Sequence, residues 1–189
     1  MITLNIFKIR DDVELPTYGT TLANCFDLSF QPTESHVKGY DKYNNPISQY
    51  VTDRGEISIY PGDRLLIPTG LVFKIERLVT VENYSDILSY GTQTPLQNFS
   101  IRLHPRSGLS LKRGLTLANS EGVVDVLYQE EVFVLLTNIS NMGQAIARGD
   151  RIAQAEVVVN EPINFVVLTK KPDRHSERAG GFGSTGVSQ

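Results

Sequence analysis

The chain has 189 residues, of which 40% are hydrophobic and 21% charged, which is typical of one soluble globular domain. Its formal net charge of -3 argues against a nucleic-acid duplex as a partner, because duplex binding depends on clustered Lys and Arg. A single cysteine, Cys25, excludes a disulfide framework within one chain, and with no signal-like N-terminus and no long apolar run we expect a cytoplasmic protein.

Apolar residues recur mostly with a period of two, which predicts β-strands. This pattern occupies residues 2–9, 56–60, 98–103, 130–138, 151–159 and 163–169. The run 64–75 is interrupted by Pro68 and Gly70, which indicates two short strands or one bent strand. Many short strands with turn residues between them predict an all-β sandwich or barrel, with at most a turn or two of helix near 107–114.

Two polar or mixed stretches, 31–55 and 76–97, do not fit this pattern. We interpret them as elaborated loops or added hairpins in a domain that covers residues 1–170. One hypothesis is that these stretches are structural additions. The other is that they bind another protein. The remainder, 171–189, is rich in Gly and has no periodicity, so we expect a flexible C-terminal arm.

The stretch HPRSGLSLKRG, 104–114, leads from a predicted strand through Pro105 into the predicted helix. Backbone N–H groups at such a junction are unpaired and favour an anion. Arg106 would add charge and the Ser107 hydroxyl a directional donor. The alternative is a turn that carries a surface arginine.

Three further stretches contain acidic or amide side chains in apolar surroundings. In 117–132, Gly122 suggests a tight turn, and Asp125 lies between valines, either as a buried structural acceptor or as a group that takes a proton from water. Asp27 could cap a turn or orient a ligand. In the predicted strand 151–159, strict alternation places Arg151 and Gln154 on opposite faces, so they need not share a role.

The glycine-rich stretch ERAGGFGSTG, 177–186, contains one aromatic residue, Phe182. Successive backbone N–H groups, with Ser184 and Thr185, could wrap phosphates. Phe182 could then stack on a flat ring. The stretch therefore suggests that the arm contacts phosphates and a flat ring.

The stretches NCFDL, PRSGL, EGVVDVLY, GDRIAQ and RAGGFGSTG occur in this order between residues 24 and 186. Together they resemble the five ordered motifs of the trimeric deoxyuridine triphosphatase (dUTPase) family. The resemblance implies an all-β, jelly-roll-like barrel that forms a homotrimer with active sites shared among the chains. It also implies that the C-terminal arm closes over a neighbouring site. The source organism stays open, with a phage or a virus among the candidates.

The resemblance implies hydrolysis of dUTP to dUMP and pyrophosphate, which limits uracil incorporation into DNA and supplies dUMP for thymidylate synthesis. Asp125 would position the water for in-line attack on the α-phosphate. Mg²⁺ would be held chiefly by the substrate phosphates, and Asp27 would join its water network indirectly.

The implied substrate contacts fall into three groups: a uracil-reading hairpin around 119–122, the Tyr128 ring under the deoxyribose, and phosphate-binding groups. Phe182 of the arm would cover the uracil. The implied substrate-binding residues are Arg106, Ser107, Gly108, Asn119, Gly122, Val124, Tyr128, Gln154, Arg178, Phe182, Gly183, Ser184 and Thr185.

Some positions depart from the family pattern. Leu127 replaces a second acid, Gln129, Glu130 and Glu131 follow the tyrosine, and Arg178 lies one residue closer to the phenylalanine. The alternatives are a dCTP deaminase or bifunctional deaminase–dUTPase of the same fold, and a regulatory protein that keeps the fold. The strand VFVLLTN lacks the terminal glutamate that a deaminase needs, and the retained site residues argue against an inactive protein.

Overall fold

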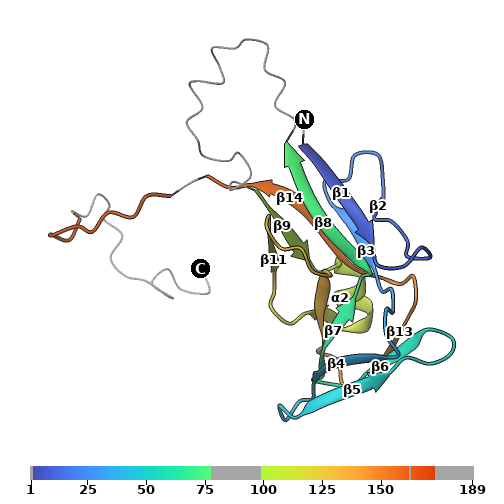
Figure 1. Cartoon of the computed structure of the whole chain (residues 1–189). Coiled ribbons are helices and arrows are strands. Elements are labelled where there is room, and N and C mark those ends of the chain that lie inside the picture. Colours follow the sequence, from blue (N-terminus) through green and yellow to red (C-terminus); the bar gives the residue numbers. More distant parts are fainter. Residues whose placement is uncertain (1, 78–98, 162, 173–189) are drawn as a thin grey trace.

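A computed structural model describes residues 2–77, 99–161 and 163–172 of the chain. These residues form antiparallel strands with one short helix, so the all-β prediction is confirmed (Figure 1). Among these residues there is no helix long and apolar enough to cross a membrane.

Two five-stranded sheets make up the body of the molecule, and two pairs of strands extend it (Figure 1). One sheet has the order β10 (Leu115–Leu117), β12 (Phe133–Asn138), β7 (Arg64–Pro68), β4 (His36–Tyr40) and β5 (Pro46–Tyr50). The other has the order β11 (Gly122–Asp125), β9 (Phe99–His104), β14 (Arg151–Val159), β3 (Phe26–Ser29) and β2 (Thr17–Tyr18). The pairs are β1 (Ile2–Lys8) with β8 (Leu71–Arg77), and β13 (Gln144–Ala147) with β6 (Glu56–Ile59).

The hydrophobic core follows the alternation that the sequence shows. In β7, Leu65 and Ile67 are fully buried while Leu66 between them is 46% exposed. In β9, Ile101 and Leu103 are buried on the core side. Burial of such a side chain contributes about 1.5–3 kcal/mol, so the strand register is fixed by which residues face the core.

The interrupted run after residue 64 forms two strands in different sheets. β7 ends at Pro68, and β8 begins at Leu71 and pairs with β1. Between them Gly70 has a φ of 69°, and a Cβ there would lie 2.6 Å from Val13 Cγ2. The bend therefore needs a glycine for both conformation and space.

The segment 31–55 contains the β4–β5 hairpin, which extends the edge of one five-stranded sheet through pairing of β4 with β7. A Cβ on Gly39 would overlap the Arg64 carbonyl oxygen, so a glycine allows this close docking. Most of the second insertion, 78–98, and the arm from 173 onward lie outside the described residues.

The helix is α2 (Ser107–Arg113), as the sequence predicts, and it ends at Gly114 with a φ of 63°. The predicted strand at 163–169 is wrong, because the structure has no strand there. Phe165 is 90% exposed and Val167 93%, and the segment leads away from the sheets (Figure 1). A strand needs a hydrogen-bonded partner, and none of the described strands pairs with this segment.

Candidate functional site

A basic cavity lies where β9 ends and α2 begins, beside β3 and β14. Its volume is about 550 Å³. Four basic side chains and one acid line it, together with small and polar residues. The charged residues are Arg106, Lys112, Arg113, Arg151 and Asp27. Although the chain as a whole has a net charge of -3, this cavity is therefore suited to an anion.

Asp27 holds two of these arginines in place. Its Oδ1 accepts from Arg106 Nε at 2.8 Å, and its Oδ2 accepts from Arg151 Nη1 at 3.0 Å. The Asp27 side chain is only 11% exposed, and Arg106 also donates to the Arg151 carbonyl oxygen at 3.2 Å. Charge-assisted bonds of this kind are strong and directional, so they fix both guanidinium groups at the cavity wall.

The described residues offer no group of three or more His, Cys, Asp or Glu side chains that could hold a metal ion. Both Asp27 oxygens already accept from arginines, so this carboxylate is not free for direct ligation. The indirect link between Asp27 and a metal stays a prediction.

A β-bulge brings together two residues that strict alternation would separate. The register between β14 and β3 shifts between Arg151 and Ala153, and Ile152 and Ala153 are both buried. The extra residue reverses the parity of the strand, so Arg151 and Gln154 line the same cavity. The expectation that they lie on opposite faces is therefore wrong.

The other predicted phosphate contacts also line this cavity. Ser107 and Gly108 are exposed in the first turn of α2, and Gln154 Nε2 donates to the Pro105 carbonyl oxygen at 3.0 Å. A Cβ on Gly108 would meet nothing within 4 Å, so the packing of the chain itself does not require a glycine there.

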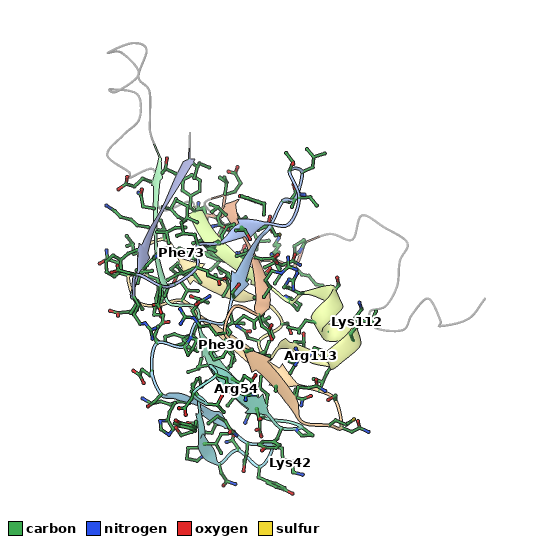
Figure 2. The ribbon with its side chains drawn as sticks, turned by 90° about the vertical axis from the view of Figure 1, so that its right-hand side faces the viewer. Phe30, Lys42, Arg54, Phe73, Lys112 and Arg113 are labelled. Atoms are coloured by element: carbon green, nitrogen blue, oxygen red, sulfur yellow. The ribbon has the colours of Figure 1, made fainter. Side chains whose placement is uncertain are left out.

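The sequence predictions did not include three of the basic lining residues, Lys112, Arg113 and Arg151 (Figure 2 shows the first two on α2). Lys112 and Arg113 could have been found from the sequence, because they are two adjacent basic residues in the last turn of the helix. Cys25 also lines the cavity. Burial, followed by the charges of Glu156 and Asp27, raises the pKa of its thiol, so the neutral form is favoured.

A second cavity of about 440 Å³ lies between β12 and β11 with the turn that precedes β11. It is lined by Asn119, Gly122, Val124, Asp125 and Tyr128, together with leucines and valines of the core. Asp125 is exposed, so the alternative that it is a buried acceptor is wrong.

Two residues of this cavity, Asp125 and Tyr128, are joined by the turn between them. The Tyr128 N–H donates to the Asp125 carbonyl oxygen at 3.0 Å. Burial, followed by the nearby Glu130 and Glu131, raises the pKa of Tyr128, so its hydroxyl stays protonated.

The turn between β10 and β11 contains Ser120, which has a φ of 62°. These two strands pair with β12 and β9 and not with each other, so the hairpin expected around 119–122 is wrong and the turn instead connects the two five-stranded sheets. Gly122 already belongs to β11, and a Cβ there would lie 3.0 Å from the Leu103 side chain. Gly122 therefore lets β11 pack closely on β9, and the strain of the turn lies at a serine instead.

The two cavities share no lining residue. Asp125 pairs with Ser100 at the start of β9, whereas Asp27 pairs with Gln154, which pairs with His104 at its end. Four residues along the strands and three strand spacings separate Asp125 from Asp27, which amounts to about 20 Å. One chain therefore does not bring the Asp125 carboxylate to the basic cavity.

Five predicted contacts lie outside the described residues and stay predictions: Arg178, Phe182, Gly183, Ser184 and Thr185.

The dUTPase family model matches residues 70–186 of this chain, which is more than half of its length. The chain belongs to the dUTPase family. It is 35% identical over 187 residues to the deoxyuridine 5'-triphosphate nucleotidohydrolase of Rhizobium johnstonii, with 98% of this chain and 94% of the relative covered.

Solved dUTPases have the same all-β jelly-roll fold at low sequence identity. The dUTPase of Staphylococcus bacteriophage 80alpha, solved with dUPNHPP, is 15% identical with a TM-score of 0.67, covering 98% of this chain and 99% of that one. A mutant dUTPase from phage phi11 of S. aureus, whose structure shows a structural Mg(II) ion, is 13% identical with a TM-score of 0.60, covering 89% and 97%.

Replacement of Asp27 tests whether it positions the arginines of the cavity. Asp27→Asn removes a shielded charge between two guanidinium groups, so we expect a loss of about 2 kcal/mol in the free energy of unfolding. We also expect weaker binding of pyrophosphate. Urea unfolding and isothermal titration calorimetry measure the two effects.

Asp12 offers a matched control, because it also bridges two arginines, Arg10 and Arg148, but is 47% exposed and lies outside the cavity. Asp12→Asn should change stability much less than Asp27→Asn, because exposed ion pairs are screened by water, and should leave pyrophosphate binding intact. Equal effects of the two substitutions would contradict a special role for Asp27.

Proposed function

We propose that the chain is a dUTP diphosphatase that hydrolyses dUTP to dUMP and pyrophosphate. The observation that supports this most strongly is the pair of cavities, one basic and one beside Asp125 at the end of β11. Phosphate-binding and nucleoside-binding groups are the two parts that a nucleoside triphosphatase needs. Family membership and a relative that acts on deoxyuridine 5'-triphosphate give the substrate.

In this proposal the cavity beside Asp125 takes the nucleoside. Backbone groups of the turn after Asn119 read the edge of the base, and the Tyr128 ring lies against the sugar. Tyr128 is 40% exposed, so its ring face is accessible to a ligand while its turn is fixed to Asp125. An aromatic face against the sugar leaves little room for an additional hydroxyl group.

Asp125 then aims a water molecule at the α-phosphate. Its side chain is exposed beside the nucleoside cavity, so water can reach it. A carboxylate is a weak base near neutral pH. Asp125 therefore accelerates the reaction chiefly by holding the water in line with the leaving pyrophosphate.

The basic cavity takes the phosphate chain. Arg106, oriented by Asp27, supplies positive charge, and the first-turn N–H groups of Ser107 and Gly108 with the Gln154 amide supply donors. Mg²⁺ enters as part of the substrate, bound to the triphosphate, which fits a cavity whose one carboxylate is already paired with arginines.

The separation of the two cavities supports a homotrimer in which neighbouring chains complete each site. A catalytic group must lie within about 3.5 Å of the reacting atoms, and Asp125 and Asp27 of one chain are too far apart for one nucleotide. The exposed apolar side chains of Phe165 and Val167 also suit an oligomer, in which they would be covered.

The arm after residue 172 would close over such a shared site. Binding of another protein through the 31–55 hairpin stays a prediction. Cys25 is a free thiol, which suits a reducing compartment such as the cytoplasm.

The substrate and the role of Asp125 are tested together by steady-state kinetics. We expect pyrophosphate release from dUTP and none from the four standard deoxynucleoside triphosphates, with no ammonia from dCTP. Asp125→Asn should lower kcat by about 10²- to 10⁴-fold with little change in dUTP binding, because the water loses its positioning group. Glu130→Gln, an exposed neighbour in the same loop, is the control. Near-normal turnover of Asp125→Asn would contradict the mechanism.

Gly108 tests the phosphate site without disturbing the fold. Gly108→Ala should stabilise α2 slightly, because alanine is the better helix former, and the chain leaves space for the methyl group. If phosphate approaches this backbone, KM for dUTP should rise about tenfold, which corresponds to about 1.4 kcal/mol of lost binding. Unchanged KM with raised thermal stability would remove Gly108 from the site.

A further inference from the structure

The loop from Asp125 to Val132 carries Tyr128 and is fastened to the body of the domain at Glu131. The Glu131 side chain is half-buried, unlike the exposed Gln129 and Glu130 before it. Its Oε1 accepts from the Gly70 N–H at 2.7 Å, and its Oε2 accepts from the Thr33 hydroxyl at 3.4 Å. Glu131 thus connects the loop to the β7–β8 bend and to the segment that precedes β4.

Neighbouring residues fix the direction in which the Gly70 N–H points. Gly70 has a positive φ and cannot carry a side chain because of Val13, so its N–H points in a fixed direction. Next along the chain, Val132 donates to the Leu71 carbonyl oxygen at 2.9 Å, and its own carbonyl accepts from buried Thr69 Oγ1 at 2.6 Å. The side-chain contact of Glu131 therefore continues a set of bonds that joins β12 to this bend.

The same residue is joined directly to the tyrosine. The Tyr128 hydroxyl donates to the Glu131 backbone carbonyl oxygen at 2.9 Å. The Tyr128 N–H donates to the Asp125 carbonyl oxygen, so the residue is held at both ends: by its backbone at the end of β11 and by its hydroxyl at Glu131. Displacement of Glu131 would release the hydroxyl end.

The partly buried position of the Glu131 carboxylate disfavours its charged form. Burial raises the pKa of Glu131, and the nearby Glu34 adds to this, while the bonds from Gly70 and Thr33 act in the opposite direction. No basic side chain forms an ion pair with Glu131 among the described residues. The two hydrogen bonds are therefore what compensates the buried charge.

We propose that Glu131 is a positioning residue for Tyr128: by binding the Gly70 N–H it fixes the ring against the sugar and so sets the preference for deoxyribose over ribose. This inference deepens the proposed function and rests on it. Glu131 does not touch the substrate in this account and acts through the orientation of the tyrosine ring.

The test compares Glu131→Ala with Glu131→Gln, since glutamine keeps an oxygen that can accept from Gly70. Glu131→Ala should raise KM for dUTP on the order of tenfold with a change in kcat below about threefold, because ground-state binding is what is lost. Its preference for dUTP over UTP should fall by a similar factor. Glu131→Gln should restore both values to within about threefold of the wild type, and Glu130→Gln should match the wild type.

A readout that does not depend on activity is hydrogen exchange of the Gly70 amide. Exchange should be faster in Glu131→Ala and protected in Glu131→Gln. If the wild type fails to hydrolyse dUTP, the proposed function is wrong. Exchange of the Gly70 amide still reports whether Glu131 binds it. Unchanged Gly70 protection in Glu131→Ala would overturn the inference, as would lost protection with an unchanged preference for dUTP over UTP.

A double-mutant cycle separates positioning from general destabilisation. Tyr128→Phe keeps the ring but removes the hydroxyl bond to Glu131. If Glu131 acts through that bond, Glu131→Ala should affect KM less in the Tyr128→Phe background than alone. Thr33→Val, which removes only the longer bond, gives a milder variant if Glu131→Ala does not fold, and it should shift KM in the same direction. Full additivity in the cycle would overturn the proposal.

Discussion

The pairing of β9 with β11 on one side and β14 on the other positions the two groups of candidate site residues in the described part of the chain. The start of β9 pairs with Asp125, and its end leads into Arg106 and the first turn of α2. Since alternate residues of β9 are buried in the core, a shift of register would expose Ile101 and Leu103, and the ladder is therefore fixed. The distance between the Asp125 carboxylate and the arginines of the basic cavity follows from this register.

Because the two cavities lie apart, an isolated subunit would hold only parts of the proposed active site. Each chain has an oriented cluster of arginines at one place and a nucleoside-sized cavity with an exposed carboxylate at another. Assembly can bring the two types of surface together without any change in the subunit. In the proposed trimer, catalysis would therefore depend on oligomerisation.

Both halves of the site are held by acids that do not act on the substrate in this account. Asp27 fixes two arginines, and Glu131 joins the Tyr128 loop to the bend at Gly70. In each case a carboxylate largely or partly removed from water binds directional donors, so the geometry of the site is set before the nucleotide arrives.

Patterns that depend on neighbouring residues could be read from the sequence. The break at Pro68 and Gly70 predicts two short strands or one bent strand, of which the structure has the first, and the short helix after Pro105 is where the sequence places it. Features that depend on distant partners could not. The bulge that joins Arg151 to Gln154 arises from the register with β3, and the segment 163–169 has strand-like composition without a partner strand in the described chain. The ion pairs of Asp27 join residues from three strands or loops, which no local pattern reveals.

Complementation between two inactive variants tests the shared site most directly. Asp125→Asn lacks the hydrolytic carboxylate, and Arg106→Gln lacks the phosphate-binding charge but keeps a donor for Asp27. When the two are co-expressed in equal amounts, a trimer with shared sites should recover about a quarter of the wild-type activity, because one neighbouring pair in four joins the intact groups in the required order. Activity no higher than that of either variant alone would contradict the account.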